Sequence, residues 1–220
     1  METNKTIVLI DGFNLYHSLK EWHPRHHRWI HFGRLADELL GKNFIVEKII
    51  YFTAFSVNEV KKSRHQLLIQ ANRTDERFSY IKGKFKKSTT RCRAKCKELF
   101  EVYNEKETDV NIAIHLIETA YEKKYSKCLV ISGDTDYIPA IKLAQKINPS
   151  LDIGVGFPLK RENKELKDMA KFTRHINENL VKHCLLEETL TLKSGNTISC
   201  PPEWLNKTKS NPLYLGLEEK

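Results

Sequence analysis

The sequence predicts an α/β protein, a three-layer α/β/α sandwich whose central sheet is mainly parallel. Short apolar runs with β-branched residues occur at 6–10, 46–55, 128–131 and 151–157. Such runs predict buried strands. Each run is followed by a segment that is expected to be helical. Strands that alternate with helices form parallel sheets with helices packed on both faces.

Length and composition narrow the class of protein. A chain of 220 residues has room for one α/β domain with additional segments. Its hydrophobic content of 40% and charged content of 30% are typical of globular proteins and exclude a disordered chain. The net charge of +9 favours a polyanionic partner, nucleic acid before membrane. No apolar run has the length of a membrane span, and residues 1–10 lack a signal-peptide core, which together predict a cytoplasmic protein.

The first half of the chain supplies two core strands. Apolar runs predict the strands, amphipathic spacing predicts the helices, and Gly41 ends one helix. Residues 22–31 are rich in His, Arg and Trp and indicate a solvated connection, with a nucleic-acid-contacting loop as the alternative. The expected elements are a strand at 6–10, helices at 15–21 and 32–40, a strand at 46–55, a helix at 58–72 and an exposed strand at 78–85.

The second half of the chain repeats the alternation of strands and helices, and its last part has a different sequence pattern. Thr108 is expected to cap a helix that runs from Asp109 to about residue 121. Its expected apolar stripe consists of Val110, Ala113, Ile114, Ile117 and Ala120. The remaining expected elements are a strand at 128–131, a helix at 137–147, a strand at 151–157, a helix at 163–171, a short edge strand at 173–176 and a β-hairpin at 189–200.

Two carboxylates, Asp134 and Asp136, directly follow the strand at 128–131. Ligands of open α/β sheets bind at the carboxyl ends of strands. Neighbouring carboxylates repel each other there, and a hard cation such as Mg²⁺ removes that penalty. The alternative is that Asp134 caps the next helix and Asp136 lies in its first turn.

Other polar residues occupy equivalent places. Asp11 and Asn14 follow the strand at 6–10, and Asp109 begins a helix that could meet the same edge of the sheet. Four carboxylates at one edge would be destabilising without a metal. A helix cap is the alternative role for Asn14, and simple pairing with the helix dipole is the alternative for Asp109.

A single-signed run of positive charge occupies residues 82–97, with no acidic residue before Glu98. Neutralising phosphates releases counterions and gives sequence-independent affinity for nucleic acid. We therefore expect this run to follow a nucleic-acid strand, with a solvated face as the alternative. Its cations are Lys82, Lys84, Lys86, Lys87, Arg91, Arg93, Lys95 and Lys97.

The cysteines predict free thiols. Five is an odd number, and their positions lack the spacing of a disulfide framework. Cys92 and Cys96 are spaced CxxxC, but no second Cys/His pair follows at zinc-finger spacing. A zinc site completed by distant residues is the less favoured alternative.

Three segments carry a resemblance to a known family. TIVLIDGFNLYHSL, EKETDVNIAIHLIETA and CLVISGDTDYIPAI resemble, in this order, the signature blocks of NYN domains. These domains belong to the PIN-like ribonucleases, which include bacterial LabA-like proteins. NKELKDMAKF resembles the helix after their last core strand. The resemblance covers about residues 5–180 and implies a PIN-like domain, expected at 1–186. The change in sequence character after residue 186 predicts a C-terminal hairpin and polar tail at 187–220.

The resemblance also implies metal-dependent cleavage of RNA in single-stranded or flexible regions. Mg²⁺ or Mn²⁺ would activate water and neutralise charge on the leaving oxygen. RNA is the expected partner, DNA is left open, and a homo-oligomer is compatible with the sequence. By motif match, Asn14 and Ser132 would orient the phosphate or a water, and Glu105 matches a frequent family position. The implied metal ligands, by motif match, are Asp11, Asp109, Asp134 and Asp136.

Two other functional hypotheses are alternatives to an active nuclease. His115 stands where relatives often carry another acid, which favours a reduced metal set or a weak second metal. The first alternative is therefore a catalytically weak nucleic-acid-binding module of the same fold. A haloacid-dehalogenase-like phosphatase is the second, but its nucleophile block resembles DxDxT, whereas the first strand here ends in DGFN.

Overall fold

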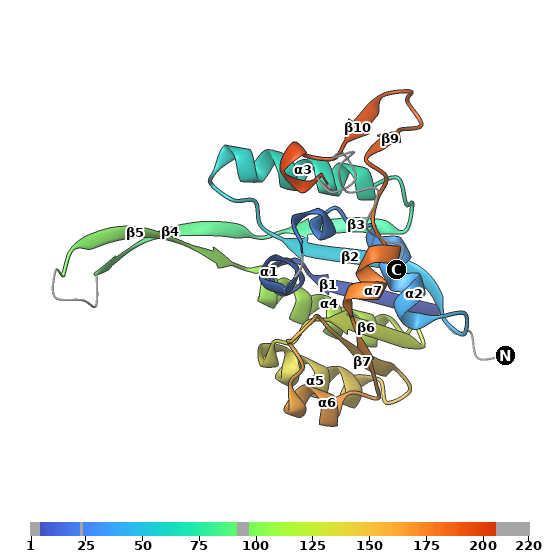
Figure 1. Cartoon of the computed structure of the whole chain (residues 1–220). Helices are drawn as coiled ribbons and strands as arrows, with labels where there is room; N and C mark the ends of the chain where they lie inside the picture. Colours follow the sequence, from blue (N-terminus) through green and yellow to red (C-terminus); the bar gives the residue numbers. More distant parts are fainter. Residues whose placement is uncertain (1–4, 23, 92–96, 206–220) are drawn as a thin grey trace, which may run out of the picture.

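A six-stranded parallel sheet forms the centre of the molecule (Figure 1). The computed structural model describes residues 5–22, 24–91 and 97–205. All five strand pairings in this sheet are parallel, which confirms the predicted fold class. In sheet order the strands are β3 (Phe78–Lys82), β2 (Ile45–Thr53), β1 (Lys5–Asp11), β6 (Lys127–Ile131), β7 (Asp152–Phe157) and β8 (Phe172–His175).

Helices cover both faces of the sheet because its strands are apolar on both sides. Val8 and Ile10 of β1 belong to one buried cluster, whereas Ile7 and Leu9 belong to the other. The first cluster is covered by α1 (Gly12–Trp22), α2 (Phe32–Leu40), α3 (Glu59–Asn72) and α7 (Glu178–His183). The second is covered by α4 (Thr108–Glu122), α5 (Ile138–Ile147) and α6 (Lys164–Met169).

The strand order reverses beside β1. From β1 the chain runs outward to β2 and β3, then returns to β6 on the other side of β1 and continues outward to β7 and β8. Loops that leave β1 and β6 therefore diverge to opposite faces, which opens a crevice at their carboxyl ends. The fold thus directs a ligand to the end of β1, where Asp11 lies.

A two-stranded antiparallel arm, β4 (Lys84–Arg91) and β5 (Leu99–Lys106), projects from the body beside α1 (Figure 1). Gly83 separates it from β3, and its amide donates to the Thr53 carbonyl at 2.8 Å. A Cβ on Gly83 would lie 2.7 Å from the Lys106 carbonyl oxygen, so the root of the arm requires glycine. The prediction of one strand at 78–85 was therefore wrong: the chain forms β3 and β4 instead.

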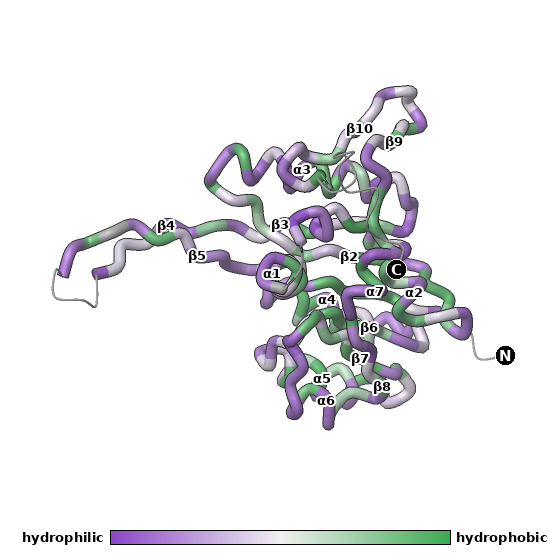
Figure 2. Tube along the Cα trace, viewed as in Figure 1, coloured by the Kyte–Doolittle hydropathy of each residue, from purple (hydrophilic) through white to green (hydrophobic). Residues whose placement is uncertain are grey.

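Most of the arm is hydrophilic, in contrast to the core strands (Figure 2). The strand β5 was not predicted, and it pairs with β4, which lies in the expected basic segment.

The C-terminal hairpin is confirmed as β9 (Thr189–Thr191) and β10 (Thr197–Ser199). Ile198 and Trp204 are buried in the same cluster as Trp29. The Trp29 indole Nε1 donates to the Glu187 carbonyl at 2.8 Å. This part of the chain is therefore packed against the face of the sheet that carries α1, α2 and α3.

The predicted apolar stripe of the helix after Thr108 was only partly correct: Ala120 is buried and Ala113 and Ile117 pack against the same cluster, but the centre of the buried face lies elsewhere. Ile112 and Leu116 are fully buried against the sheet, together with Ala120. Val110 and Ile114, which belonged to the predicted stripe, are 60% and 52% exposed. Apolar residues occur nearly all round this helix, so their spacing alone did not decide which face is buried.

Within the described ranges, none of the helices combines the length and apolarity needed to cross a membrane.

Candidate functional site

Asp11 is the centre of the candidate site. It is the last residue of β1, and its side chain is only 3% exposed. Its carboxylate accepts three hydrogen bonds, each at 2.9 Å. The donors are the backbone amide of Asn14, the Ser132 hydroxyl and the Tyr137 hydroxyl. These donors fix the orientation of the carboxylate at the point where the sheet reverses.

Burial raises the pKa of Asp11 above its ordinary value, and the charge of Asp109 raises it further. The three hydrogen bonds oppose this shift because they stabilise the ionised form. A cation beside Asp11 would favour the carboxylate in the same way.

Tyr137 joins Asp11 to Asp109. Its hydroxyl oxygen lies 2.9 Å from Asp11 Oδ2 and 2.8 Å from Asp109 Oδ1. A phenol has one proton to donate, so the two carboxylates share this single donor. The sequence reasoning missed Tyr137, although it directly follows the second aspartate of the GDTDY motif.

Asp134 and Asp136 have the roles of the alternative interpretation: Asp134 caps a short helix, and Asp136 lies in its first turn. The Asp134 carboxylate accepts from the Asp136 amide at 3.0 Å and caps the short helix η2 (Thr135–Tyr137). Asp134 is half-buried and Asp136 is exposed. The Asp134 amide donates to the Ser132 hydroxyl oxygen at 3.1 Å, which links this turn to Asp11.

Asn14 connects the loops that leave β1 and β6. Its side-chain oxygen accepts from the Gly133 amide at 3.1 Å. A Cβ on Gly133 would collide with the Arg161 carbonyl, so glycine permits the loop after β7 to approach closely. The Ser18 hydroxyl holds that same loop by donating to the Leu159 carbonyl at 2.9 Å. Three strand ends are therefore held together around Asp11.

The donor atoms at this site suit a hard divalent cation. Carboxylate, amide and hydroxyl oxygens are the ligands that Mg²⁺ and Mn²⁺ prefer. The side chains that carry these atoms are not gathered closely enough for a complete metal site. Across the part of the chain that the structure describes, no three His, Cys, Asp or Glu side chains are grouped to hold an ion. Asp11 and Asp109 converge on Tyr137, and the Asp134 carboxylate is engaged in its cap.

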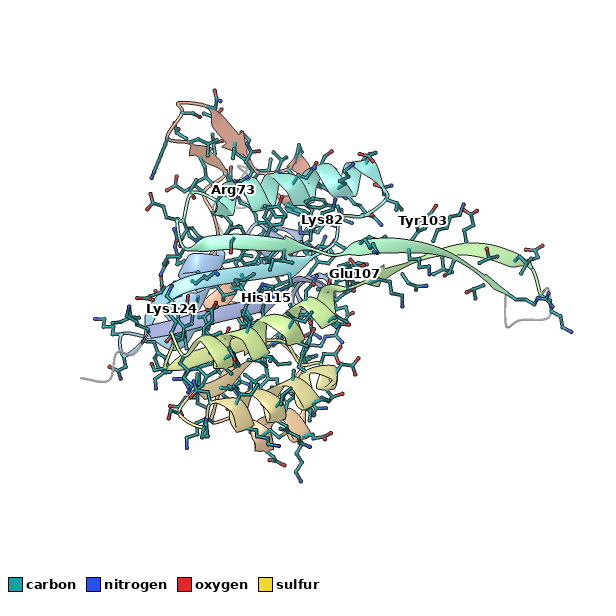
Figure 3. All side chains as sticks on the ribbon, turned by 180° about the vertical axis from the view of Figure 1, so that it is seen from behind. Arg73, Lys82, Tyr103, Glu107, His115 and Lys124 are labelled. Atoms are coloured by element: carbon teal, nitrogen blue, oxygen red, sulfur yellow. The ribbon has the colours of Figure 1, made fainter. Side chains whose placement is uncertain are left out.

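Glu105 and His115 have structural partners. The Glu105 carboxylate accepts from both the amide and the hydroxyl of Thr108, and so caps the start of α4. His115 lies further along this helix, beyond Glu107 at its start (Figure 3). Its ring Nδ1 is 2.9 Å from the Asn111 carbonyl, and the ring packs edge-on against Phe52.

The predicted basic segment lies mainly on the arm, where successive side chains face opposite sides. Two of its lysines are ion-paired, Lys84 with Glu107 and Lys87 with Glu101. The Lys82 ammonium lies 5.3 Å from the centroid of the Phe55 ring. Lys86, Arg91 and Lys97 are exposed. Arg93 and Lys95 lie outside the described residues.

The cysteine prediction is confirmed where the structure describes it. Cys128, Cys184 and Cys200 are buried free thiols. Cys92 and Cys96 lie outside the described residues, so the expectation about zinc stays a prediction.

Comparison with known proteins identifies the family. The model of the NYN domain matches residues 5–176. The 6-hydroxy-3-succinoylpyridine 3-monooxygenase HspA of Pseudomonas putida (strain DSM 28022 / S16) is 22% identical to this chain over 229 residues. That alignment covers 86% of this chain and 72% of HspA.

A crystal structure of the protein VPA0982 of Vibrio parahaemolyticus RIMD 2210633, described as of unknown function, has a similar fold. Its TM-score is 0.51 at 17% identity, covering 80% of this chain and 94% of the Vibrio chain. At these identities the monooxygenase name belongs to HspA alone, and the Vibrio structure supports the fold alone.

Proposed function

This chain belongs to the NYN domain family of PIN-like nucleases, and from that membership we propose that it is a metal-dependent ribonuclease. It would hydrolyse phosphodiester bonds of RNA, with single-stranded or flexible regions as substrate. The observation that carries the proposal is the buried Asp11 carboxylate, which is oriented by three donors at the reversal point of the sheet and shares Tyr137 with Asp109.

The proposed ion-holding residues are Asp11, Asp109, Asp134 and Asp136. One or two Mg²⁺ or Mn²⁺ ions, when bound, supply Lewis-acid activation of water and neutralisation of phosphate charge. Because only Asp11 and Asp109 converge in the structure, the proposal requires Asp134 or Asp136 to turn toward them.

The chain's own residues supply orientation and water exclusion. The Ser132 hydroxyl contacts Asp11, and the Asn14 side chain contacts the Gly133 amide in the adjacent loop; both side chains would orient the phosphate or an attacking water. Burial of Asp11 lowers the local dielectric constant, which strengthens each charge interaction at the site. The exposed cations Lys86, Arg91 and Lys97 of the arm segment would hold the RNA backbone.

The test is cleavage of labelled single-stranded RNA and of DNA of matched sequence, with Mn²⁺, with Mg²⁺ and with EDTA. We expect metal-dependent cleavage of RNA that is lost in Asp134→Asn. Asp168→Asn on the exposed surface of α6 removes the same charge and should keep full activity. Metal-independent cleavage, or equal cleavage by both variants, would contradict the proposal.

A catalytically weak nucleic-acid-binding module is the second candidate. It is favoured by the absence, among the described residues, of a group of three metal-ligating side chains, and by His115, which stands where relatives often carry an acid. This candidate predicts salt-sensitive RNA binding without turnover in either metal. Turnover that Asp11→Asn abolishes would exclude it.

A further inference from the structure

A basic groove lies next to the acidic site, at the carboxyl ends of β1 and β2. It has a volume of about 700 Å³ and is lined by α1, α3, the short 3-10 helix η1 (Arg25–Arg28) and the root of the arm. Gly12, which directly follows Asp11, is part of its wall. Asp11 points to the α4 side of the sheet and the groove lies on the α1 side. One ligand could therefore extend from the groove across the end of β1.

The groove carries an excess of positive charge. Its fixed cations are Lys20, Arg25, Arg28, Lys61 and Arg64, and its carboxylates are Glu105 and Glu203. Both carboxylates have partners within the protein, since Glu105 caps α4 and Glu203 pairs with Arg64 at 2.8 Å. The charge of the remaining four cations favours an anionic ligand.

Arg28 lines the groove and is crowded by other cations. Its guanidinium Nε is buried without a hydrogen-bond partner in the described structure. Burial lowers the pKa of Arg28, and the nearby charges of Arg25 and Arg64 lower it further. Its guanidinium carbon lies 5.7 Å from the centroid of the Tyr16 ring. A phosphate would offset the crowded positive charge and match the planar donor fork of arginine.

Aromatic rings alternate with these cations. Phe13 of α1 contacts Phe85 of the arm, with ring centroids 5.8 Å apart. Tyr103 of the arm also lines the groove and is 41% exposed. Figure 3 shows Tyr103 on the arm beyond Glu107, so an extended ligand could reach it from the root of the arm. Cations that bind phosphates and rings that stack on bases together characterise sites for single-stranded nucleic acid.

We propose that this groove binds a single-stranded segment of nucleic acid, with phosphates on Arg25 and Arg28 and bases against Phe85 and Tyr103. The inference rests on the proposed function for the nature of the ligand. It adds a binding surface on α1, α3 and the segment between α1 and α2 to the exposed cations of the arm, where ion pairs consume part of the charge. A duplex is excluded as the preferred ligand because its bases are stacked on each other.

The first test is fluorescence anisotropy of a labelled 12-nucleotide RNA in EDTA at several salt concentrations. We expect Arg25→Gln/Arg28→Gln to weaken binding roughly tenfold and to reduce the salt slope by about 1.4, the value for two phosphate contacts on a single strand. Lys142→Gln/Lys146→Gln on α5 removes the same charge from the opposite face and should change affinity less than about twofold.

A second double variant, Arg25→Gln/Lys61→Gln, changes only exposed side chains. It serves for the same test if replacing Arg28 prevents folding. Groove variants that bind like the α5 control would overturn the proposal. Competition by micromolar 5′-AMP would also overturn it, because the groove would then accept a mononucleotide. Equal affinity for duplex RNA would overturn the preference for single strands. RNA and DNA probes of matched sequence show which of the two nucleic acids the groove binds more tightly.

The second test concerns stacking. Phe85→Ala should weaken binding by about 5- to 150-fold, the range for loss of one base–aromatic stack. Tyr121→Ala on the exposed surface of α4 is the control and should bind as the wild type does. Since EDTA removes divalent ions, binding is measured independently of cleavage. Groove-dependent binding without any cleavage would refute the proposed function alone, whereas cleavage with groove-independent binding would refute this inference alone.

Discussion

Tyr137 has the largest structural role of any side chain that the sequence reasoning missed. Its hydroxyl lies between two carboxylates, one buried and one at the start of α4. Without this donor, Asp11 would keep only Asn14 and Ser132 as hydrogen-bond partners. Tyr137 thus stabilises the acidic site when no cation is bound.

Tyr137→Phe should therefore destabilise the protein by about 1–3 kcal/mol in EDTA, because a buried carboxylate loses a donor. In Mn²⁺ the loss should be smaller, since a cation would take over the interaction with Asp11. Urea denaturation measures both values. Tyr125→Phe, which removes a hydroxyl from the same apolar cluster, is the control. An equal loss in EDTA and in Mn²⁺ would show that no cation binds beside Asp11.

His65 makes the stability depend on pH. Burial lowers its pKa to about 4, and its ring contacts the Tyr51 hydroxyl at 3.2 Å. The unfolded chain takes up this proton near pH 6.5, so between these values it binds more protons than the folded chain. The free energy of unfolding should fall by up to about 3 kcal/mol as pH falls from 6.5 to 4.

Asp11 titrates over part of the same range with the opposite sign, because its raised pKa lets the folded state bind the extra proton. The contribution of His65 is therefore measured as the difference between wild type and His65→Gln. The variant should lose less stability than wild type between pH 6.5 and 4. His183→Gln, at an exposed position of α7, is the matched control. Identical pH profiles for wild type and His65→Gln would contradict this account.

At the scale of single elements, α4 shows where sequence periodicity fails. Ile112 and Ile114 are two positions apart and chemically identical, yet one is fully buried and the other 52% exposed. Helical spacing permits both the predicted stripe and the observed one, because apolar residues surround the helix. Contact with the sheet decides between the two, and a single sequence does not contain that information.

The two isoleucines give a matched pair of variants. Ile112→Ala should cost about 2–5 kcal/mol, because it leaves a cavity against the sheet. Ile114→Ala removes the same atoms from an exposed position and should cost less than about 1 kcal/mol. Urea denaturation compares them directly. Equal losses, or a larger loss at Ile114, would mean that α4 is rotated relative to the structure described.

The arm and the groove illustrate a second limit. A segment that alternates and is rich in lysine predicts an exposed strand, and β4 is one. Glu101 of the partner strand β5 and Glu107 at the start of α4 pair with two of those lysines, so the one-dimensional run overstated the free charge. The groove draws its walls from segments far apart in the chain, and only the fold brings them together.

At the scale of the whole molecule, the strands of the sheet and the helices that cover it were predictable, because their apolar runs are separated by clear turn signals. The rule that ligands bind at the carboxyl ends of strands indicated Asp11 and Asn14, and the motif match added Ser132; hydrogen bonds link these three residues and Gly133 in the structure. It did not indicate Tyr137, since an aromatic residue at the start of a helix is usually assigned to the core.

Whole-molecule electrostatics follow from this arrangement. The acidic site and the basic groove lie on opposite sides of the end of β1, so a polyanion held in the groove passes close to Asp11. The net charge of +9 adds a long-range attraction that salt screens. Cleavage at subsaturating enzyme should therefore decrease steeply between about 50 and 200 mM salt. A rate independent of salt would contradict electrostatic capture.

The measurement that tests the account most directly is single-turnover cleavage of single-stranded RNA in Mn²⁺, with enzyme in excess so that binding does not limit the rate. Asp11→Asn and Asp109→Asn, the two carboxylates joined by Tyr137, should each slow cleavage at least about a hundredfold. Asp168→Asn should cleave at the wild-type rate. A rate within threefold of wild type for Asp11→Asn would show that the end of β1 is not the catalytic centre.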